Sequence, residues 1–365
     1  MPDKKDNYIR VNADRLRDCT SDCLQAHGVR SSDADIVADV LVAADLRGIE
    51  SHGVARLSSY YLGGLRENNL NPDPDRRFAA DAGAIFTVDA DNGLGHPACH
   101  EAMQKCISLA ADSGIAVGGV RNSNHFGIAG YYAMMALEQD MIGLCLTNSQ
   151  PLVTPTYGRK RTLGTNPIAV AVPTGDRPSF VLDMATSVVP IGKMEVFRRR
   201  EETVPQSWGA DADGLPTDDP GTVVEEGSLF PLGGTADTSG YKGYGLAAVV
   251  DILCGVLTGA DFLTGVSSGD ASEAAGVGHF VAALKIDALM SPKEFESRMD
   301  AFINQLKSAP LAENCDEIYV AGEKEHLHHK RNQCEGVPLH PKVYDQLMET
   351  CDHLNVQTSG LKEIG

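Results

Sequence analysis

The sequence predicts an α/β protein in which a mixed β/α core is joined to a helical domain built from both ends of the chain. Helical patterns fill the first part of the chain and return near its end, whereas β-branched strands alternate with helices in between. The 365 residues are enough for two or three domains. We therefore expect residues 1–80 and 305–365 to form the helical domain and residues 81–304 to form the core.

Two helices are expected before the first strand. Residues 12–28 and 31–68 carry apolar side chains at helical spacing, and Ser31 or Ser32 can cap the second helix. Residues 69–77, NLNPDPDRR, contain two prolines and are expected to form the loop at the domain boundary.

The rest of the chain is assigned from the same two patterns. Apolar β-branched runs predict strands, and longer runs with a helical period predict helices. The expected strands cover residues 84–90, 115–123, 142–149, 165–174, 180–186 and 277–287. The expected helices cover residues 97–114, 127–141, 241–260, 291–310 (with proline in its first turn) and 337–354. The polar residues 198–222 are expected to be irregular.

Composition narrows the kind of protein. Lys and Arg number 31 and Asp and Glu number 50, so the net charge is −19, which disfavours nucleic acid and anionic membranes as partners. No apolar run approaches the ~20 residues that span a bilayer, and the N-terminus has no signal-peptide pattern. Nine scattered cysteines favour reduced thiols. We expect a soluble cytoplasmic enzyme.

One short stretch, GIESHGVARLSSYY, places His52, Arg56 and Tyr60 at steps of four residues. In a helix these side chains would share one face. That face would carry a proton-transfer group, a fixed cation and a phenol. An exposed basic face is unusual on so acidic a protein, so we interpret it as functional. The alternative is a solvated helix face.

A second histidine lies just before an expected helix. In SNHFGIAGYY, His125 precedes Gly127, Ile128 and Ala129, whose amides would be free at a helix N-terminus. Such amides favour an anion or a neutral imidazole. The alternative is a histidine that caps its own helix.

Asp183 and Lys242 are further candidates for ligand contacts. Asp183 ends an apolar strand in FVLDMATSVV, where α/β proteins often keep their ligands, although it could instead cap a helix. Lys242 lies among three glycines in GYKGYG, where a backbone without side chains lets a phosphate approach closely. The alternative for Lys242 is an ordinary turn lysine.

Two apparent motifs are interpreted as structural. Gly93, Gly95 and Ala98 match a dinucleotide-binding fingerprint, but the next strand ends in VRNSNHFG and supplies no carboxylate for a ribose. We expect a tight strand-to-helix turn there. The segment HLHHKRNQC, with His326, His328, His329 and Cys334, lacks the spacing of known zinc sites, so we expect a solvated loop and no metal.

Taken in order, the motifs resemble one family: the malate/L-lactate dehydrogenases of the second, non-Rossmann type. Its relatives include ureidoglycolate, sulfolactate, diketogulonate and cyclic-imine carboxylate oxidoreductases. The resemblance runs from about Asn12 to Leu347. It rests on SHGVARLSSYY, SNHFGIAGYYAMMA, GTNPIAVAVPT, FVLDMATSVV, WGADADGLPTDDP, PLGGTADTSGYKGYGLAAVVDILCGVLTGA and VGHFVAALKID.

The resemblance implies a NAD(P)-binding fold unrelated to the Rossmann type and a homodimer with active sites near the subunit interface. It implies acid–base roles for His52 and His125, and substrate contacts for Ser51, Arg56 and Tyr60. It implies cofactor contacts for Ser149, Asp183, Met184, Ala185 and Lys242. A further cofactor segment is usually Pro-Gly-Glu, and here it reads Ala321, Gly322 and Glu323.

The expected reaction is NAD-dependent interconversion of a 2-hydroxy acid and a 2-oxo acid, with malate or lactate as the hydroxy acid and with NADP as an alternative cofactor. Two other functions stay open at this point. One is a reductase of cyclic imino acids with the same fold, and the other is a dimeric binding protein without turnover.

Overall fold

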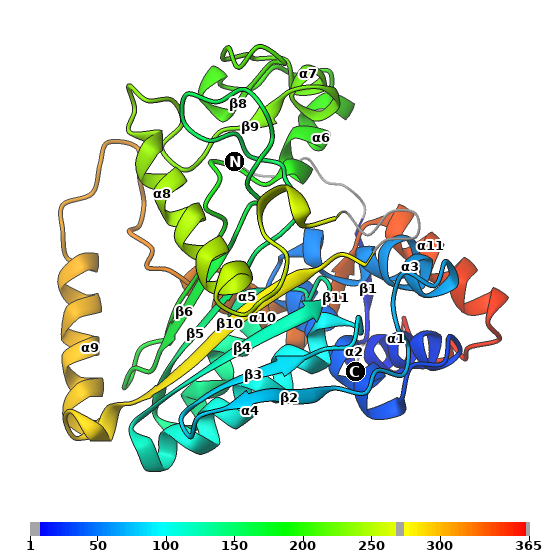
Figure 1. Ribbon diagram of the computed structural model, residues 1–365, viewed down its shortest axis with the longest axis horizontal. Helices are drawn as coiled ribbons and strands as arrows, with labels where there is room; N and C mark the ends of the chain where they lie inside the picture. Colours follow the sequence, from blue (N-terminus) through cyan, green and yellow to red (C-terminus); the bar gives the residue numbers. More distant parts are fainter. Residues whose placement is uncertain (1–7, 268–273, 363–365) are drawn as a thin grey trace.

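The computed structural model describes residues 8–267 and 274–362, and a seven-stranded sheet forms its centre (Figure 1). The strands are β2 (Arg77–Asp81), β3 (Ile85–Asp89), β4 (Ile115–Ser123), β5 (Met141–Thr147), β6 (Ile168–Val172), β7 (Phe180–Met184) and β10 (Val277–Lys285). Their order across the sheet is β2-β3-β4-β10-β5-β6-β7. β3 and β4 pair in parallel, and the other neighbours pair antiparallel. The principal helices against the sheet are α4 (Gly95–Ser113), α5 (Ala129–Met135) and α8 (Gly240–Asp251).

Both faces of this sheet are covered, as the alternation along β5 shows. Cys145 lies in the core that the sheet forms with α4 and α5. Leu144 and Leu146 belong to a separate cluster with Val250 of α8. Because successive strand residues point to opposite faces, α8 lies on the face opposite to α4 and α5.

The two ends of the chain form a second core together. β1 pairs antiparallel with β11, and α1 contacts both α2 and α11, so that N-terminal and C-terminal helices lie together in Figure 1. Leu16, Leu41, Leu347 and Cys351 are among the buried side chains of this core. The elements are β1 (Ile9–Val11), α1 (Ala13–Gln25), α2 (Ser31–Leu46), β11 (Val337–Leu339) and α11 (Pro341–His353). The predicted fold class is confirmed.

Helix α2 belongs to both cores. Its Val37 and Leu41 pack in the core built from the two chain ends, whereas its Val40 and Ala44 pack in the core under α4. A helix that buries side chains on two sides connects the two hydrophobic clusters directly.

The remaining elements lie around the sheet. α9 begins with proline after the side-chain cap of Ser291, as the sequence predicts. The segment predicted to be irregular lies mostly in loops, but it includes β8, which pairs with β9 beyond the segment, and the start of the short helix α7. The elements are α6 (Ile191–Arg199), β8 (Gly209–Ala210), α7 (Pro220–Glu225), β9 (Ser228–Leu229), α9 (Pro292–Lys307) and α10 (Glu323–Glu335). No helix within the described ranges is long and apolar enough to cross a membrane.

The prediction of one helix over residues 31–68 is wrong after α2. Two 3₁₀ turns, Glu50–His52 and Val54–Arg56, lead into a π-helix at Leu57–Tyr61, which continues as α3 (Leu62–Arg66). Gly53 separates the two turns. The expected serine cap of α2 is also absent, because Arg30 occupies the N-cap position without a side-chain bond.

The prediction of a solvated loop at HLHH is wrong as well, because this segment lies in α10. Positive-φ glycines, Gly322 and Gly336, bound the helix on each side. Its Asn332 is fully buried, donates to the carbonyl of Leu46 at 3.0 Å and accepts from Arg10 at 3.0 Å. Good helix formers such as Glu, Lys, Leu and Arg fill the segment, although it lacks an apolar stripe.

Candidate functional site

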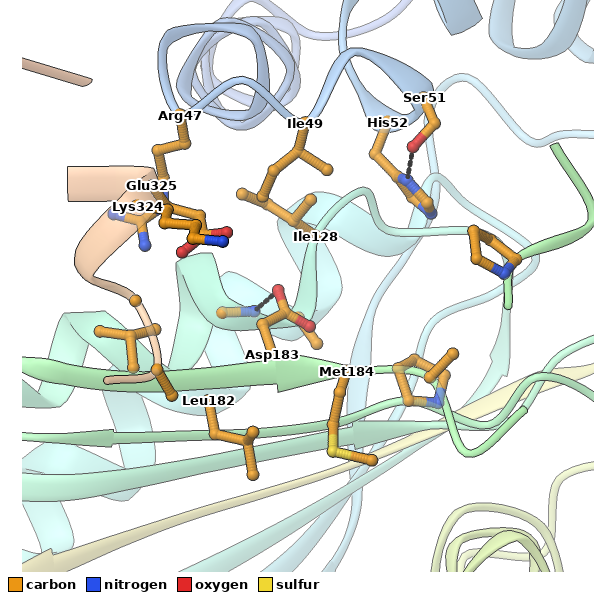
Figure 2. A pocket seen from close by; sticks show the side chains of 18 of the residues that line it. Arg47, Ile49, Ser51, His52, Ile128, Leu182, Asp183, Met184, Lys324 and Glu325 are labelled. Carbon is orange, nitrogen blue, oxygen red and sulfur yellow. Dashed lines mark hydrogen bonds between the residues drawn. The ribbon is translucent and has the colours of Figure 1, made fainter. Parts of the chain in front are cut away.

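A cavity of about 600 Å³ opens where α2, α5, β7 and α10 meet (Figure 2). One wall comes from residues after α2, the opposite wall from β7, and one end from the start of α10. Ligand cavities of this size are large enough for a cofactor and substrate. The lining side chains include Arg47, Ile49, Ser51, His52, Ile128, Leu182, Asp183, Met184, Ala185, Lys324 and Glu325, and backbone lines it at Gly127, Gly130 and Gly322.

Asp183 connects β7 to the start of α5. Its Oδ2 accepts the Gly130 amide at 2.7 Å, so this carboxylate lies in the cavity and also caps a neighbouring helix (Figure 2). Burial raises the pKa of Asp183, while the bond from Gly130 and the charge of Arg47 oppose that rise. The cap interpretation is confirmed for the start of α5, and contact of the same carboxylate with a ligand stays a prediction.

The amides at the start of α5, which were predicted to be free, are partly hydrogen-bonded in the structure. α5 begins at Ala129, two residues later than predicted. The Gly127 amide donates to Nδ1 of His125 at 3.3 Å, and the Gly130 amide donates to Asp183. The Gly127 amide thus meets an imidazole, one of the two groups that the sequence favoured there, and the Gly130 amide meets a carboxylate of the protein itself.

Charged side chains gather at the end of the cavity formed by α10. Arg47 follows α2, and Lys324 and Glu325 lie in the first turn of α10 (Figure 2). Burial lowers the pKa of Arg47, and the charges of Glu325 and Asp183 oppose that shift. None of these three residues was predicted. Arg47 stands five positions before His52, and Lys324 and Glu325 directly follow the predicted cofactor segment at residues 321–323.

His52 lines the other end of the cavity, and the ring of His125 lies against it, outside the lining. His52 stacks on His125 with 5.6 Å between ring centroids and 24° between planes. Ser51 Oγ lies 2.9 Å from His52 Nδ1, a hydrogen bond drawn in Figure 2. Burial, and next the charge of Arg56, lower the pKa of His52 to about 4. Burial, and next the charges of His52, Arg56, His96 and His279, lower the pKa of His125 well below its usual value.

Arg56 and Tyr60 stand beside these rings, although the helix predicted to align them is broken into turns. Arg56 Nε donates to the carbonyl of Ser51 at 2.9 Å. Within the described part of the chain, no carboxylate forms an ion pair with Arg56. The Tyr60 ring lies edge-on to His125 at 5.5 Å. Neither side chain lines the cavity itself. Arg56 contacts Ser51, which does, and Tyr60 contacts His125, which does not.

One neighbour of the histidines was not predicted. The Tyr61 hydroxyl lies 2.6 Å from His125 Nδ1, and Tyr61 is fully buried. Its ring lies edge-on to His96 at 4.9 Å. The available signal was the second tyrosine of the pair, because a buried tyrosine hydroxyl usually needs a partner.

The turn that carries His52 is held by a buried carboxylate. Asp45 Oδ2 accepts the Val54 amide at 2.8 Å, and a Cβ at Gly53 would lie only 1.9 Å from Asp45 Oδ1. Only glycine leaves room for this carboxylate at the junction between the two 3₁₀ turns. Burial raises the pKa of Asp45 from 3.8 to about 8.

Replacing Asp45 with Asn should make the protein less sensitive to rising pH. The folded-state pKa lies above the unfolded one, so the native state loses stability as the pH rises from about 4 toward 8. Asparagine keeps an oxygen for the Val54 amide and cannot ionise. The free energy of unfolding at pH 8 should rise by roughly 1–3 kcal/mol relative to wild type, with little difference at pH 4.

Urea unfolding at both pH values measures this, with the exposed Asp18→Asn as the control. Equal pH dependence of Asp45→Asn and wild type would show that Asp45 ionises normally.

Three predicted cofactor contacts lie outside the cavity lining. Ser149 bonds through Oγ to the Thr165 amide at 3.0 Å, and Thr165 does line the cavity. Glu323 forms an ion pair with Lys307 at 2.6 Å and so is committed to another partner. Lys242 is exposed on α8. By contrast, Ser51, His52, Asp183, Met184, Ala185 and Gly322 all line the cavity.

The glycine motif after β3 is a packed strand-to-helix turn, as predicted. Residues 93–98 are all buried, and none lines the cavity. A Cβ at Gly95 would lie 2.1 Å from the Asn124 carbonyl oxygen, so protein backbone occupies the space that a phosphate would need. Among the described residues, no group of three or more His, Cys, Asp or Glu side chains is placed to hold a metal ion.

Comparisons with known proteins agree with this architecture. The family model described as malate/L-lactate dehydrogenase matches residues 11–348. The chain is 42% identical to a malate dehydrogenase of Pyrococcus abyssi over 96% of its length and 97% of the relative. It is 37% identical to an L-sulfolactate dehydrogenase of Methanocaldococcus jannaschii over 92% of its length and 94% of the relative.

A solved structure is similar as well. Malate dehydrogenase from Pyrococcus horikoshii OT3 superimposes with a TM-score of 0.90 at 39% identity, covering 98% of this chain and 99% of that one. Near-complete coverage in sequence and in structure leaves no large part of the described chain outside the match. Family membership implies a nicotinamide cofactor and a small hydroxy- or oxo-acid substrate. The chain belongs to the malate/L-lactate dehydrogenase family and is an oxidoreductase.

Proposed function

We propose that the protein is a NAD(P)-dependent dehydrogenase that interconverts a 2-hydroxy acid and a 2-oxo acid, with malate and oxaloacetate as the preferred pair and NAD as the cofactor. The observation that carries this proposal is the stacked pair His52 and His125 at one end of the cavity, beside Arg56. Malate is favoured because a relative at 42% identity is named malate dehydrogenase.

The cavity suits a nicotinamide dinucleotide in shape and chemistry. Apolar side chains such as Ile49 and Ile128, which lie next to each other in Figure 2, offer a surface for an aromatic ring. Arg47 and Lys324 at the far end offer positive charge for phosphates, and Asp183 and Glu325 offer acceptors for hydroxyl or amide groups. When bound in its reduced form, the cofactor supplies the hydride that reduces the substrate's carbonyl carbon.

The protein's own groups hold the substrate and manage its proton. Arg56 would hold the carboxylate of the 2-oxo acid through the edge of its guanidinium that the Ser51 carbonyl does not use. An imidazole of His52 or His125 would give a proton to the carbonyl oxygen during reduction and take it back during oxidation. Tyr60 would supply a further hydrogen bond, and Ser51 would orient His52.

A direct assay tests the proposal. The protein is mixed with NADH or NADPH and with oxaloacetate, pyruvate, sulfopyruvate or a cyclic imino acid, and cofactor oxidation is followed. Oxaloacetate with NADH should give the highest kcat/KM. Turnover confined to the cyclic imine would favour the imino-acid reductase, and no turnover with any substrate would favour a binding protein.

The cofactor should protect the cavity from hydrogen exchange. On addition of NADH, amides at Asp183–Ala185 and at residues 321–325 should exchange at least several-fold more slowly, because a bound dinucleotide covers them. Amides at residues 93–98 serve as the internal control and should not change. A peptide containing Lys242 tests the contact predicted for that residue. Protection confined to residues 93–98 would place the cofactor at the glycine turn and contradict this site.

We further propose that two copies of the chain associate through one face of α8. Tyr241, Val249, Ile252 and Val256 recur at helical spacing along α8 and the turn that follows, and each is at least half exposed. Gly245 lies in the same row with open space around it. A continuous apolar row on an acidic protein suits a partner that presents the same row, as in a two-fold symmetric dimer.

Sedimentation or light scattering should then report about twice the chain mass of 38.9 kDa. Ile252→Glu should give a monomer, because a carboxylate within the row would be buried against the apolar row of the partner copy. Phe302→Glu, at a half-exposed apolar residue on α9, is the matched control and should leave the dimer intact. A dimeric Ile252→Glu protein would move the interface elsewhere.

A further inference from the structure

The rings of Tyr61, His96 and His125 lie together on the buried side of the stacked histidines. The Tyr61 hydroxyl lies 2.6 Å from His125 Nδ1, and the Gly127 amide points at the same nitrogen from 3.3 Å. An amide N–H is always a donor, so the lone pair of Nδ1 must face it. Tyr61 therefore donates to Nδ1 as well, and the ring proton of neutral His125 lies on Nε2.

The hydroxyl of Tyr61 has a second histidine nearby and does not use it. His96 lies edge-on to the Tyr61 ring at 4.9 Å, and neither of its ring nitrogens has a hydrogen-bond partner among the described residues. Burial lowers the pKa of His96 to about 3, so it stays neutral. Tyr61 is fully buried, and its bond to His125 satisfies its only polar group.

We propose that Tyr61 is a positioning residue that fixes the tautomer of His125, so that this histidine presents an Nε2–H donor to the oxygen of the substrate. The inference rests on the proposed function, in which His125 contacts the substrate. It assigns different roles to the two histidines, which the sequence does not distinguish. His125 polarises the carbonyl by a hydrogen bond, and His52 exchanges the proton.

The division of roles follows from the groups around the two rings. Burial opposes a positive charge on His125. The charges of four neighbours oppose it as well: His52, Arg56, His96 and His279. If neutral His125 gave up its Nε2 proton, Nδ1 would have to take the proton of Tyr61, whose pKa burial raises well above its usual value. Among the described residues, His52 has a hydrogen-bond partner only at Nδ1, a serine hydroxyl that can donate or accept. Its ring can therefore take up and release a proton at Nε2 without disturbing a fixed donor.

The tautomer is measurable without substrate. In protein carrying ¹⁵N-histidine, ring-nitrogen NMR distinguishes protonated from unprotonated nitrogens, and a His125→Asn spectrum assigns the signals. Wild type should show His125 with the proton on Nε2. Tyr61→Phe should shift the population toward the other tautomer and raise the pKa of His125, because a donor to the neutral ring is lost.

Kinetics supply the second readout. Tyr61→Phe should lower kcat by roughly 2- to 13-fold with KM little changed, the range for one neutral hydrogen bond. Tyr131→Phe is the control, because it also loses a hydroxyl bonded at 2.6 Å, in this case to Asp39. It should keep wild-type kcat and an unchanged His125 spectrum.

A wild-type proton on Nδ1 of His125 overturns the proposal, whether or not the variant folds. An unchanged spectrum and kcat in Tyr61→Phe overturns it too. If the enzyme turns over none of the tested acids while the NMR result holds, the proposed function fails and the positioning role stands.

Discussion

Replacing His125 with Ala should lower kcat by roughly 10²–10⁴, and replacing His52 with Ala should lower it within the same range. His52 lines the end of the cavity and His125 stacks on it, so loss of either ring removes a group that we propose moves the proton or polarises the carbonyl. Steady-state kinetics with oxaloacetate measure the loss. Binding of NADH, followed by fluorescence, should be nearly unchanged.

The two variants should differ in their pH dependence. Because the pKa of His52 is lowered to about 4, its ring is neutral and able to act as a base above about pH 5. In wild type, kcat/KM for oxidation of the hydroxy acid should therefore be flat above pH 5 and fall below it. This acid limb should persist in His125→Ala and disappear in His52→Ala.

His328→Ala, at an exposed histidine on α10, is the control and should retain full activity. Near-normal turnover in both cavity variants would show that neither histidine is an acid or base.

Arg56→Lys should reduce kcat/KM for the 2-oxo acid by roughly 10- to 150-fold. Lysine keeps the charge but loses the planar fork, so it cannot hold the Ser51 carbonyl and a substrate carboxylate together. One hydrogen bond to a charged group is worth about 1.5–3 kcal/mol, and each 1.36 kcal/mol is tenfold. Affinity for NADH should barely change, because Arg56 does not line the cavity.

Arg66→Lys is the control, because it makes the same substitution on α3, outside the site. Its kcat/KM should equal that of wild type. A fall in NADH affinity with unchanged 2-oxo-acid kinetics would assign Arg56 to the cofactor. No change in either would leave it as a solvated cation.

Much of the sheet could be predicted because its signals are local. Strands such as β3 and β7 are short apolar β-branched runs. The start of α9 is indicated by Ser291 and the proline after it. The order of strands could not be predicted, because β10 pairs with β4 and β5 across more than a hundred residues of chain.

The site was found only in part for the same reason. His52, His125 and Asp183 stand in conspicuous local sequences, but the break at Gly53 depends on Asp45, which meets it only after the chain turns back. α10 was missed because polar contacts, such as those of Asn332, anchor it in place of an apolar stripe. The bond from Tyr61 to His125 spans 64 residues and leaves no pattern in the sequence.

The double burial of α2 has a consequence for cooperativity. Val37 and Leu41 lie in one core and Val40 and Ala44 in the other, so neither cluster can melt without exposing apolar surface of the other. Arg47 and His52 follow directly after this helix. The protein should therefore unfold as a single unit, and activity and native fluorescence should be lost at the same temperature rather than in sequence.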